Sequence, residues 1–173
     1  FTSFLGKKDY LPLMFTSTET TRKERCETSN WYRPSVRSRE ITTPRQKGRP
    51  SKTRNKTFSY SGAPVHDLAS CLLYLRSLDL KVGQETVTVL HPFASAYLAR
   101  VKVLRRESHR GLNCLKMDLK LNKIGQEGKL LEYDKMKKAT LWLSDDNERL
   151  PIEIRSEVFI GDVRAILVGK KYL

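Results

Sequence analysis

One basic segment contains side chains that could bind an anion. Residues 44–56 read PRQKGRPSKTRNK and hold two prolines, six cations and no large apolar side chain. Such a segment cannot bury an apolar face, so the pattern predicts an exposed, mobile loop. Its cations are the candidate polyanion-binding residues: Arg45, Lys47, Arg49, Lys52, Arg54 and Lys56.

The centre of this segment, residues 47–50, is similar to the Gly-Arg-Pro core of the AT-hook. An AT-hook lays an arginine in the narrow minor groove of A·T-rich DNA. An ordinary solvated surface loop that is rich in basic residues can contain the same four residues. The solvated loop is the preferred interpretation, and DNA or polyanion binding is the alternative function.

Two polar groups suggest chemistry that their spacing does not support. Residues 145–148 cluster carboxylates that could hold calcium, but they lack the alternating ligand pattern of an EF-hand loop, and a hairpin turn explains them. His66, Asp67 and Ser70 fall within one helical turn, yet adjacent helical side chains point about 100° apart and do not form a triad. Asp67 and Ser70 are interpreted as first-turn capping groups.

The remaining chemistry-bearing residues match no catalytic or metal pattern. There is no H-E-x-x-H, P-loop, dinucleotide fingerprint or nucleophile elbow. Cys26, Cys71 and Cys114 form no C-x-x-C pair, and Cys71 and Cys114 are expected to be buried apolar groups. A disulfide between two of the three stays open. His91 and His109 are expected at the surface.

These patterns predict a protein that is not an enzyme and uses no metal or cofactor. An unrecognised hydrolase that uses Asp67, Asp145 or Asp146 is kept as a third hypothesis.

The elements that must position these residues are mostly strands. One clear helix is predicted at about 64–77, because Leu68, Cys71, Leu72 and Leu75 recur at helical spacing and form an apolar stripe. It is expected to pack on the core.

After Gly83 the apolar residues alternate with period two. The predicted strands are 1–15, 35–42, 87–91, 97–104, 115–122, 139–143, 150–157 and 163–168. Short turns between them imply antiparallel neighbours. The predicted fold is mainly β, a strongly curved and mostly antiparallel sheet that forms a half or full barrel with one core-packing helix.

Composition sets the outer limits of the interpretation. The 173 residues suffice for a single domain, 1–173, and the net charge of +14 favours nucleic acid, anionic lipid head groups or acidic polysaccharide. No apolar run is long enough to span a membrane. The chain begins at Phe1 without an initiator Met or signal peptide, so we expect a processed product or a part of a longer protein.

An ordered series of motifs resembles an uncharacterised bacterial family, the domain of unknown function catalogued as number 3108. Residues 64–76, followed by Leu80 and Gly83, look like its P-x-x-D-x-x-S-x-x-Y-x-x-R … L-x-x-G core. Its other strands are similar to residues 9–15, 102–107, 142–146, 149–152 and 159–163. The resemblance covers roughly residues 9–168, and the beginning of the family domain is expected to be missing.

This resemblance implies a compartment and an architecture but no mechanism. Members of the family usually carry export signals, so the expected location is the periplasm or cell envelope. The leading hypothesis is a non-enzymatic envelope domain that binds a ligand or a partner protein on a curved sheet. Tyr74, Arg76 and Trp142 are its candidate ligand-binding residues. Nucleic acid is the less favoured partner, and the charge of residues 44–56 departs from a typical member.

Overall fold

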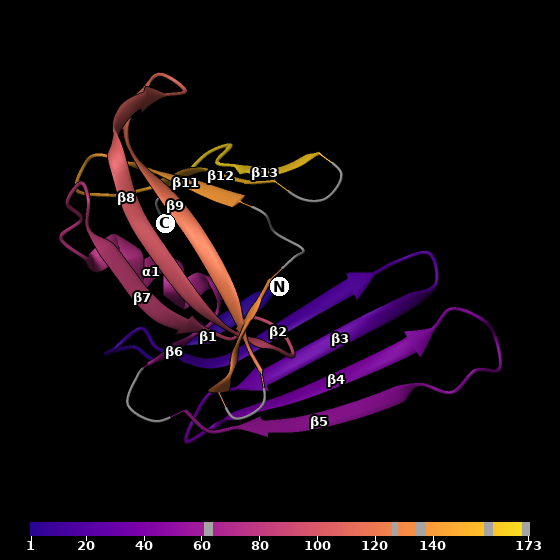
Figure 1. The fold of residues 1–173 in the computed structure, drawn as a ribbon. Helices are drawn as coiled ribbons and strands as arrows, with labels where there is room; N and C mark the ends of the chain where they lie inside the picture. Colours follow the sequence, from indigo (N-terminus) through magenta and orange to yellow (C-terminus); the bar gives the residue numbers. More distant parts are fainter. Residues whose placement is uncertain (61–63, 126–127, 134–137, 158–160, 171–173) are drawn as a thin grey trace. The chain divides into compact units, whose positions relative to one another are not determined.

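The computed structural model describes residues 1–60, 64–125, 128–133, 138–157 and 161–170 (Figure 1). The chain divides into two compact units, each described separately below. Unit 1 comprises Phe1–Leu75 and Thr88–Tyr97, and unit 2 comprises Arg76–Val87 and Leu98–Leu173. The prediction of a single domain stays a prediction.

Unit 1 contains a five-stranded antiparallel sheet within the described residues. Its strands follow one another in chain order, as short connections require. They are β1 (Thr2–Leu5), β2 (Pro12–Thr20), β3 (Glu24–Trp31), β4 (Val36–Pro44) and β5 (Lys52–Phe58). Figure 1 shows β2 to β5 as long neighbouring arrows.

The core of unit 1 is aromatic, but one face of its sheet buries polar groups. Phe15, Tyr32 and Val36 are buried together. Asn30 of β3 is also fully buried; its amide donates 2.9 Å to the Phe93 carbonyl and its oxygen accepts from Ser38 at 2.5 Å. Because these hydrogen bonds satisfy Asn30, a strand with almost no apolar residue forms where alternation predicted none.

The helix begins later than the sequence pattern predicts. α1 spans Leu68–Ser77, whereas β6 (Val65–His66) pairs in parallel with Val89 and Leu90 of β7 (Glu85–Leu90). The fixed φ of a proline such as Pro64 suits an extended segment as well as a helix start, so Pro64 did not locate the boundary. No helix among the described residues is long and apolar enough to cross a membrane.

Unit 2 contains most of the second sheet, in the order β7, β8, β9, β11, β12, β13, with β10 also paired to β9. The bounds are β8 (Ala96–His109), β9 (Leu112–Ile124), β10 (Leu130–Glu132), β11 (Lys138–Ser144), β12 (Pro151–Glu157) and β13 (Asp162–Ile166). Leu115, Met117, Leu141 and Leu143 fill its core. Arg110 and Gly111 turn β8 into β9 with positive φ of 52° and 76°, which agrees with the predicted short turns between neighbouring strands.

The fold class is confirmed as mainly β and antiparallel with one helix among the described residues. The full-barrel form of the prediction is wrong. In the described part of the chain there are two sheets, and each has unpaired ends: β1 and β5 in one, β13 and β6 in the other.

Candidate anion-binding site

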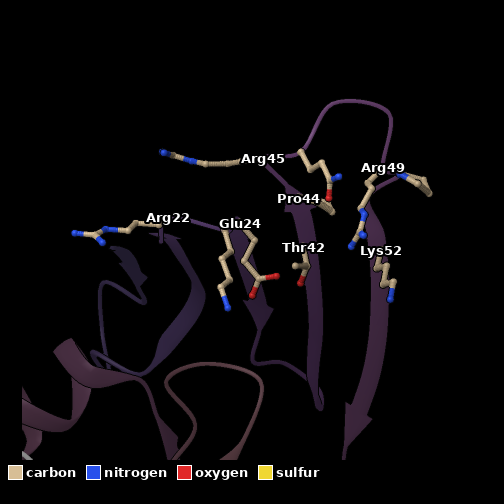
Figure 2. Close-up of a pocket in the computed structure, with 10 residues that line it drawn as sticks. Arg22, Glu24, Thr42, Pro44, Arg45, Arg49 and Lys52 are labelled. Atoms are coloured by element: carbon tan, nitrogen blue, oxygen red, sulfur yellow. The ribbon is translucent and has the colours of Figure 1, made fainter.

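An open groove of about 700 Å³ lies at the end of the unit 1 sheet (Figure 2). Two turns border it, one between β2 and β3 and one between β4 and β5. The groove is defined by Arg22, Lys23, Glu24, Thr42, Pro44, Arg45, Gln46, Arg49, Pro50 and Lys52. Five of these side chains are cations and one is a carboxylate, so we call it the basic groove.

Strand register places four of the groove's strand residues on one face of the sheet. Glu24 of β3 lies opposite Pro44 of β4, and Thr42 of β4 lies opposite Lys52 of β5. Because side chains alternate between the two faces of a strand, these four positions share a face. Figure 2 shows them along neighbouring strands below the turn formed by residues 45–51.

The turn between β2 and β3 is held by a threonine side chain. The hydroxyl of Thr21 accepts from the amides of Lys23 at 3.2 Å and Glu24 at 3.1 Å, and it donates to the Glu24 carbonyl at 3.2 Å. This local pattern is typical of turns that a hydroxyl stabilises. The Arg45 amide donates to the Lys23 carbonyl at 2.9 Å and joins this turn to the other.

The turn between β4 and β5 contains the Lys-Gly-Arg-Pro motif. Gly48 has a φ of 82°, which suits glycine, and the Arg49 amide donates to the Gln46 carbonyl at 3.4 Å. A peptide that follows a DNA minor groove must be extended along it, whereas this one reverses direction. Figure 2 shows Arg49 at the groove beside the start of β5.

The predicted loop 44–56 is therefore shorter in the structure. Pro44 ends β4 and residues 52–56 belong to β5, so only residues 45–51 connect the strands. Backbone hydrogen bonds to β4 form β5 without any apolar face, and threonines at positions 53 and 57 favour extended backbone. Absence of apolar residues indicated exposure correctly, since residues 52–57 are exposed, but it did not indicate a loop.

Within the part of the chain that the structure describes, the cations of the basic groove lack acidic partners. Among the described residues, none of the five cations lies within ion-pair distance of a carboxylate. The Glu24 carboxylate likewise lies beyond ion-pair distance of every described cation. In unit 2, by contrast, Arg106 contacts Asp145 at 2.7 Å and Arg155 contacts Glu153 at 3.0 Å. Uncompensated charge in a concave surface raises the local concentration of oppositely charged ligands.

Half of the predicted polyanion-binding residues line the basic groove. Arg45, Arg49 and Lys52 do so, whereas Lys47, Arg54 and Lys56 do not. Arg22, Lys23 and Glu24 were missed, because they sit in a polar stretch that was given no structure. Their signal is Thr21 ahead of three charged residues, a turn pattern.

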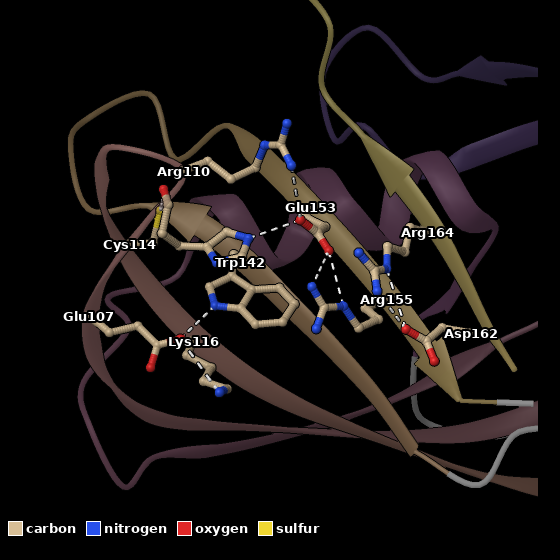
Figure 3. Close-up of polar contacts among 10 residues, drawn as sticks. Glu107, Arg110, Cys114, Lys116, Trp142, Glu153, Arg155, Asp162 and Arg164 are labelled. Atoms are coloured by element: carbon tan, nitrogen blue, oxygen red, sulfur yellow. Dashed lines mark hydrogen bonds and ion pairs between the residues drawn. The ribbon is translucent and has the colours of Figure 1, made fainter.

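Trp142, a predicted ligand-binding residue, is enclosed by its neighbours in unit 2 (Figure 3). Its Nε1 donates to Glu107 at 2.8 Å, and the His109 ring stacks on it at 4.2 Å with an interplanar angle of 11°. Lys116 and Arg155 lie 5.3 and 5.4 Å from its ring centroid. These contacts leave the side chain buried, which gives it a packing role within the sheet.

The other two predicted ligand-binding residues make contacts within their own units. Tyr74 stacks on His66 in unit 1, with ring centroids 5.0 Å apart. In unit 2, Arg76 donates from Nε and Nη2 to the Glu148 carbonyl at 3.1 and 2.8 Å. Whether Tyr74, Arg76 or Trp142 binds a ligand stays a prediction.

The acidic segment 145–148 forms a turn, as its residue spacing predicted. Asp146 Oδ1 accepts from the Ser144 hydroxyl at 2.8 Å and from the amides of Glu148 and Arg149 at 3.0 and 2.9 Å. The Ser144 hydrogen bond is the main cause that lowers the pKa of Asp146. Asp145 pairs with Arg106. Among the described residues there is no group of three potential metal ligands.

Both histidines expected at the surface are placed elsewhere. His91 is fully buried in unit 1, where Phe58 contacts its ring edge at a centroid distance of 4.8 Å. His109 is mostly buried and its Nε2 lies 3.0 Å from Glu153. A histidine before a proline or in a turn is expected to be exposed, but residues distant in the sequence cover both His91 and His109. Cys71 and Cys114 are buried as predicted, and Cys26, like them, is a free thiol.

Comparison with known proteins gives a family but no characterised relative. A search of curated proteins and a search of solved structures each found no match. The family model described as "Protein of unknown function (DUF3108)" matches residues 1–168, which span both units. The motif series therefore identified the family correctly, and the chain belongs to the DUF3108 family.

Proposed function

We propose that this chain is a non-enzymatic domain of the bacterial cell envelope that binds an anionic ligand in the basic groove. The observation that carries the proposal is the set of five groove cations with no acidic partner among the described residues. Positive charge without a nearby carboxylate attracts anions to this surface, so an anionic ligand is favoured at the groove.

The two turns support this proposal because they order the backbone that carries the cations before any ligand arrives. The Thr21 hydroxyl accepts hydrogen bonds from the amides of Lys23 and Glu24, and the 2.9 Å bond from the Arg45 amide to the Lys23 carbonyl couples the two turns. A preformed site loses less conformational entropy on binding. Arginine and lysine suit different parts of the task, since guanidinium groups bind oxyanions in a bidentate manner and ammonium groups act as point charges.

The envelope location is supported by family membership together with the export expected of such proteins. Fractionation of cells that express the natural protein tests it. Recovery in the cytoplasmic fraction would contradict this part of the proposal without affecting the groove.

Anion binding can be tested with fluorescein-labelled polyphosphate and anisotropy in a salt series. The groove variant Arg49→Ala/Lys52→Ala should weaken binding by about tenfold or more, and the salt dependence should become shallower. The control is Arg37→Ala/Arg39→Ala. It removes the same charge from exposed positions of β4 that lie outside the groove. No binding at low salt, or equal losses in both variants, would overturn the proposal.

A further inference from the structure

The basic groove contains one carboxylate that an ordinary polyanion site would lack. Glu24 lines the groove with five cations, and among the described residues no cation lies within ion-pair distance of it. The contrast is Glu27, three residues along β3, which pairs with Arg25 at 2.6 Å. A lone carboxylate repels an approaching phosphate, so Glu24 weakens the groove for any ligand that offers only negative charge.

A ligand that offers hydrogen-bond donors beside its negative charge turns Glu24 into a favourable contact. An ionised carboxylate is an acceptor only, and it binds hydroxyl groups through short, charge-assisted hydrogen bonds. The hydroxyl of Thr42 and the amide of Gln46 add neutral partners at the same surface. Cations, an acceptor and neutral hydrogen-bonding groups are the combination that a sugar carrying a phosphate would satisfy.

The size of the groove agrees with a ligand of this kind. Its volume of about 700 Å³ lies within the usual range for small-molecule sites. Because the basic turn reverses direction at Gly48, it does not present an extended arm to a nucleic acid duplex.

We infer that the basic groove recognises a phosphorylated sugar. Arg49 and Lys52 bind the phosphate, and Glu24 accepts hydrogen bonds from the sugar hydroxyls. This inference rests on the proposed anion-binding function and names the ligand class of the same site. Glu24 is the specificity determinant, since it penalises a bare anion and rewards a hydroxylated one.

The test compares two probes in Glu24→Gln by isothermal titration calorimetry. Binding of glucose 6-phosphate should weaken by about tenfold, because a neutral amide replaces a charged acceptor. Binding of inorganic phosphate should strengthen, because the repulsion is removed. The control Glu19→Gln neutralises an exposed carboxylate of β2 outside the groove and should change neither affinity.

The outcomes separate this inference from the proposed function. If Glu24→Gln strengthens both probes equally, Glu24 only repels and the sugar inference is overturned while anion binding stands. Stronger binding of a single-stranded DNA oligonucleotide than of glucose 6-phosphate by the unsubstituted protein overturns it as well. If no anion binds the unsubstituted protein, the proposed function fails with it.

A second arm distinguishes a free sugar phosphate from one carried on a lipid. Phosphatidylcholine vesicles with monophosphoryl lipid A are compared with phosphatidylcholine vesicles alone in a sedimentation assay. Retention that glucose 6-phosphate displaces, and that Glu24→Gln weakens, assigns the lipid-borne source. Glucose 6-phosphate binding in solution without vesicle retention assigns the free source. Retention on both vesicle types with no effect of Glu24→Gln contradicts the inference.

Discussion

Asp67 and Ser70 exchange two hydrogen bonds across the first turn of α1. The Ser70 amide donates to Asp67 Oδ1 at 2.7 Å, and the Asp67 amide donates to the Ser70 hydroxyl at 3.0 Å. The other carboxylate oxygen, Oδ2, accepts from the hydroxyl of Ser3 in β1. Both residues are buried, so this reciprocal cap satisfies groups that water cannot reach.

Removing the cap should destabilise unit 1. Asp67→Ala leaves the Ser70 amide and the Ser3 hydroxyl without their partner, so we expect the free energy of unfolding to fall by about 2 kcal/mol. Ser70→Ala should cost about 1 kcal/mol, and the double variant should cost less than the two singles added together. Urea unfolding followed by circular dichroism measures all three.

The control is Asp79→Ala, which removes an exposed carboxylate paired with Lys81 and should change the free energy of unfolding little. Equal effects of Asp67→Ala and Asp79→Ala would contradict the role of the cap.

Some features of this fold could be predicted because a few neighbouring residues indicate each of them. The spacing of Asp67 and Ser70 predicted the cap, and the alternation of Leu115 and Met117 predicted β9. The pairing of β8 with β9 followed from the short turn between them, where Gly111 has a φ of 76° that suits glycine. In each case the information lies within a few residues of the feature it describes.

The missed features depend on distant partners. Asn30 gave no strand signal because a buried asparagine is explained only by the carbonyl of Phe93 and the hydroxyl of Ser38. Likewise, the cations of residues 45–49 were visible as composition. Arg22 comes to the same groove only because β3 pairs with β4. The hydrophobic period and the strand propensity of the sequence do not specify which strands pair.

Burial of His91 should make stability depend on pH. Burial lowers the pKa of His91 to about 4, whereas an unfolded histidine has a pKa of about 6.5. Between these values the unfolded chain binds more protons than the folded one, so stability rises with pH across this window. Acidification from about pH 6.5 to about pH 4 should therefore cost up to about 3 kcal/mol through this residue.

The variant His91→Phe tests this contribution. Its unfolding free energy, measured in urea across the same window, should vary less with pH than that of the unsubstituted protein. His66 is present in both proteins, so its own titration cancels in the comparison. Two parallel pH profiles would show that His91 is not the group responsible.

Trp142 should control the ionisation of Glu107. The hydrogen bond from Trp142 Nε1 is the main cause that lowers the pKa of Glu107 to about 2, with Arg105 and Lys116 contributing. This carboxylate stabilises the fold above the pKa of an unfolded glutamate, about 4.3, and the stabilisation is lost as pH falls towards 2. Trp142→Phe should raise the pKa of Glu107, as followed by NMR titration of the side-chain carboxyl carbon. Trp31→Phe is the matched control, and an unchanged titration in Trp142→Phe would exclude the hydrogen bond as the cause.

Thr21 should affect anion binding without contributing any charge. Its hydroxyl makes three hydrogen bonds within the turn that carries Arg22 and Lys23. Thr21→Ala removes these bonds and leaves every cation in place, so a weaker affinity can arise only from a less ordered turn. We expect polyphosphate affinity to fall by about threefold to tenfold, with an unchanged dependence on salt because the number of charges is the same.

The control for this prediction is Thr18→Ala, an exposed threonine of β2 outside the groove. A loss of affinity confined to Thr21→Ala shows that the groove is preorganised by its turn. Ser in place of Thr21 keeps the hydroxyl and should restore binding, which separates the hydrogen bonds from the methyl group. If Thr21→Ala binds polyphosphate as tightly as Thr18→Ala does, the cations act through charge alone and the order of the turn is irrelevant to the site.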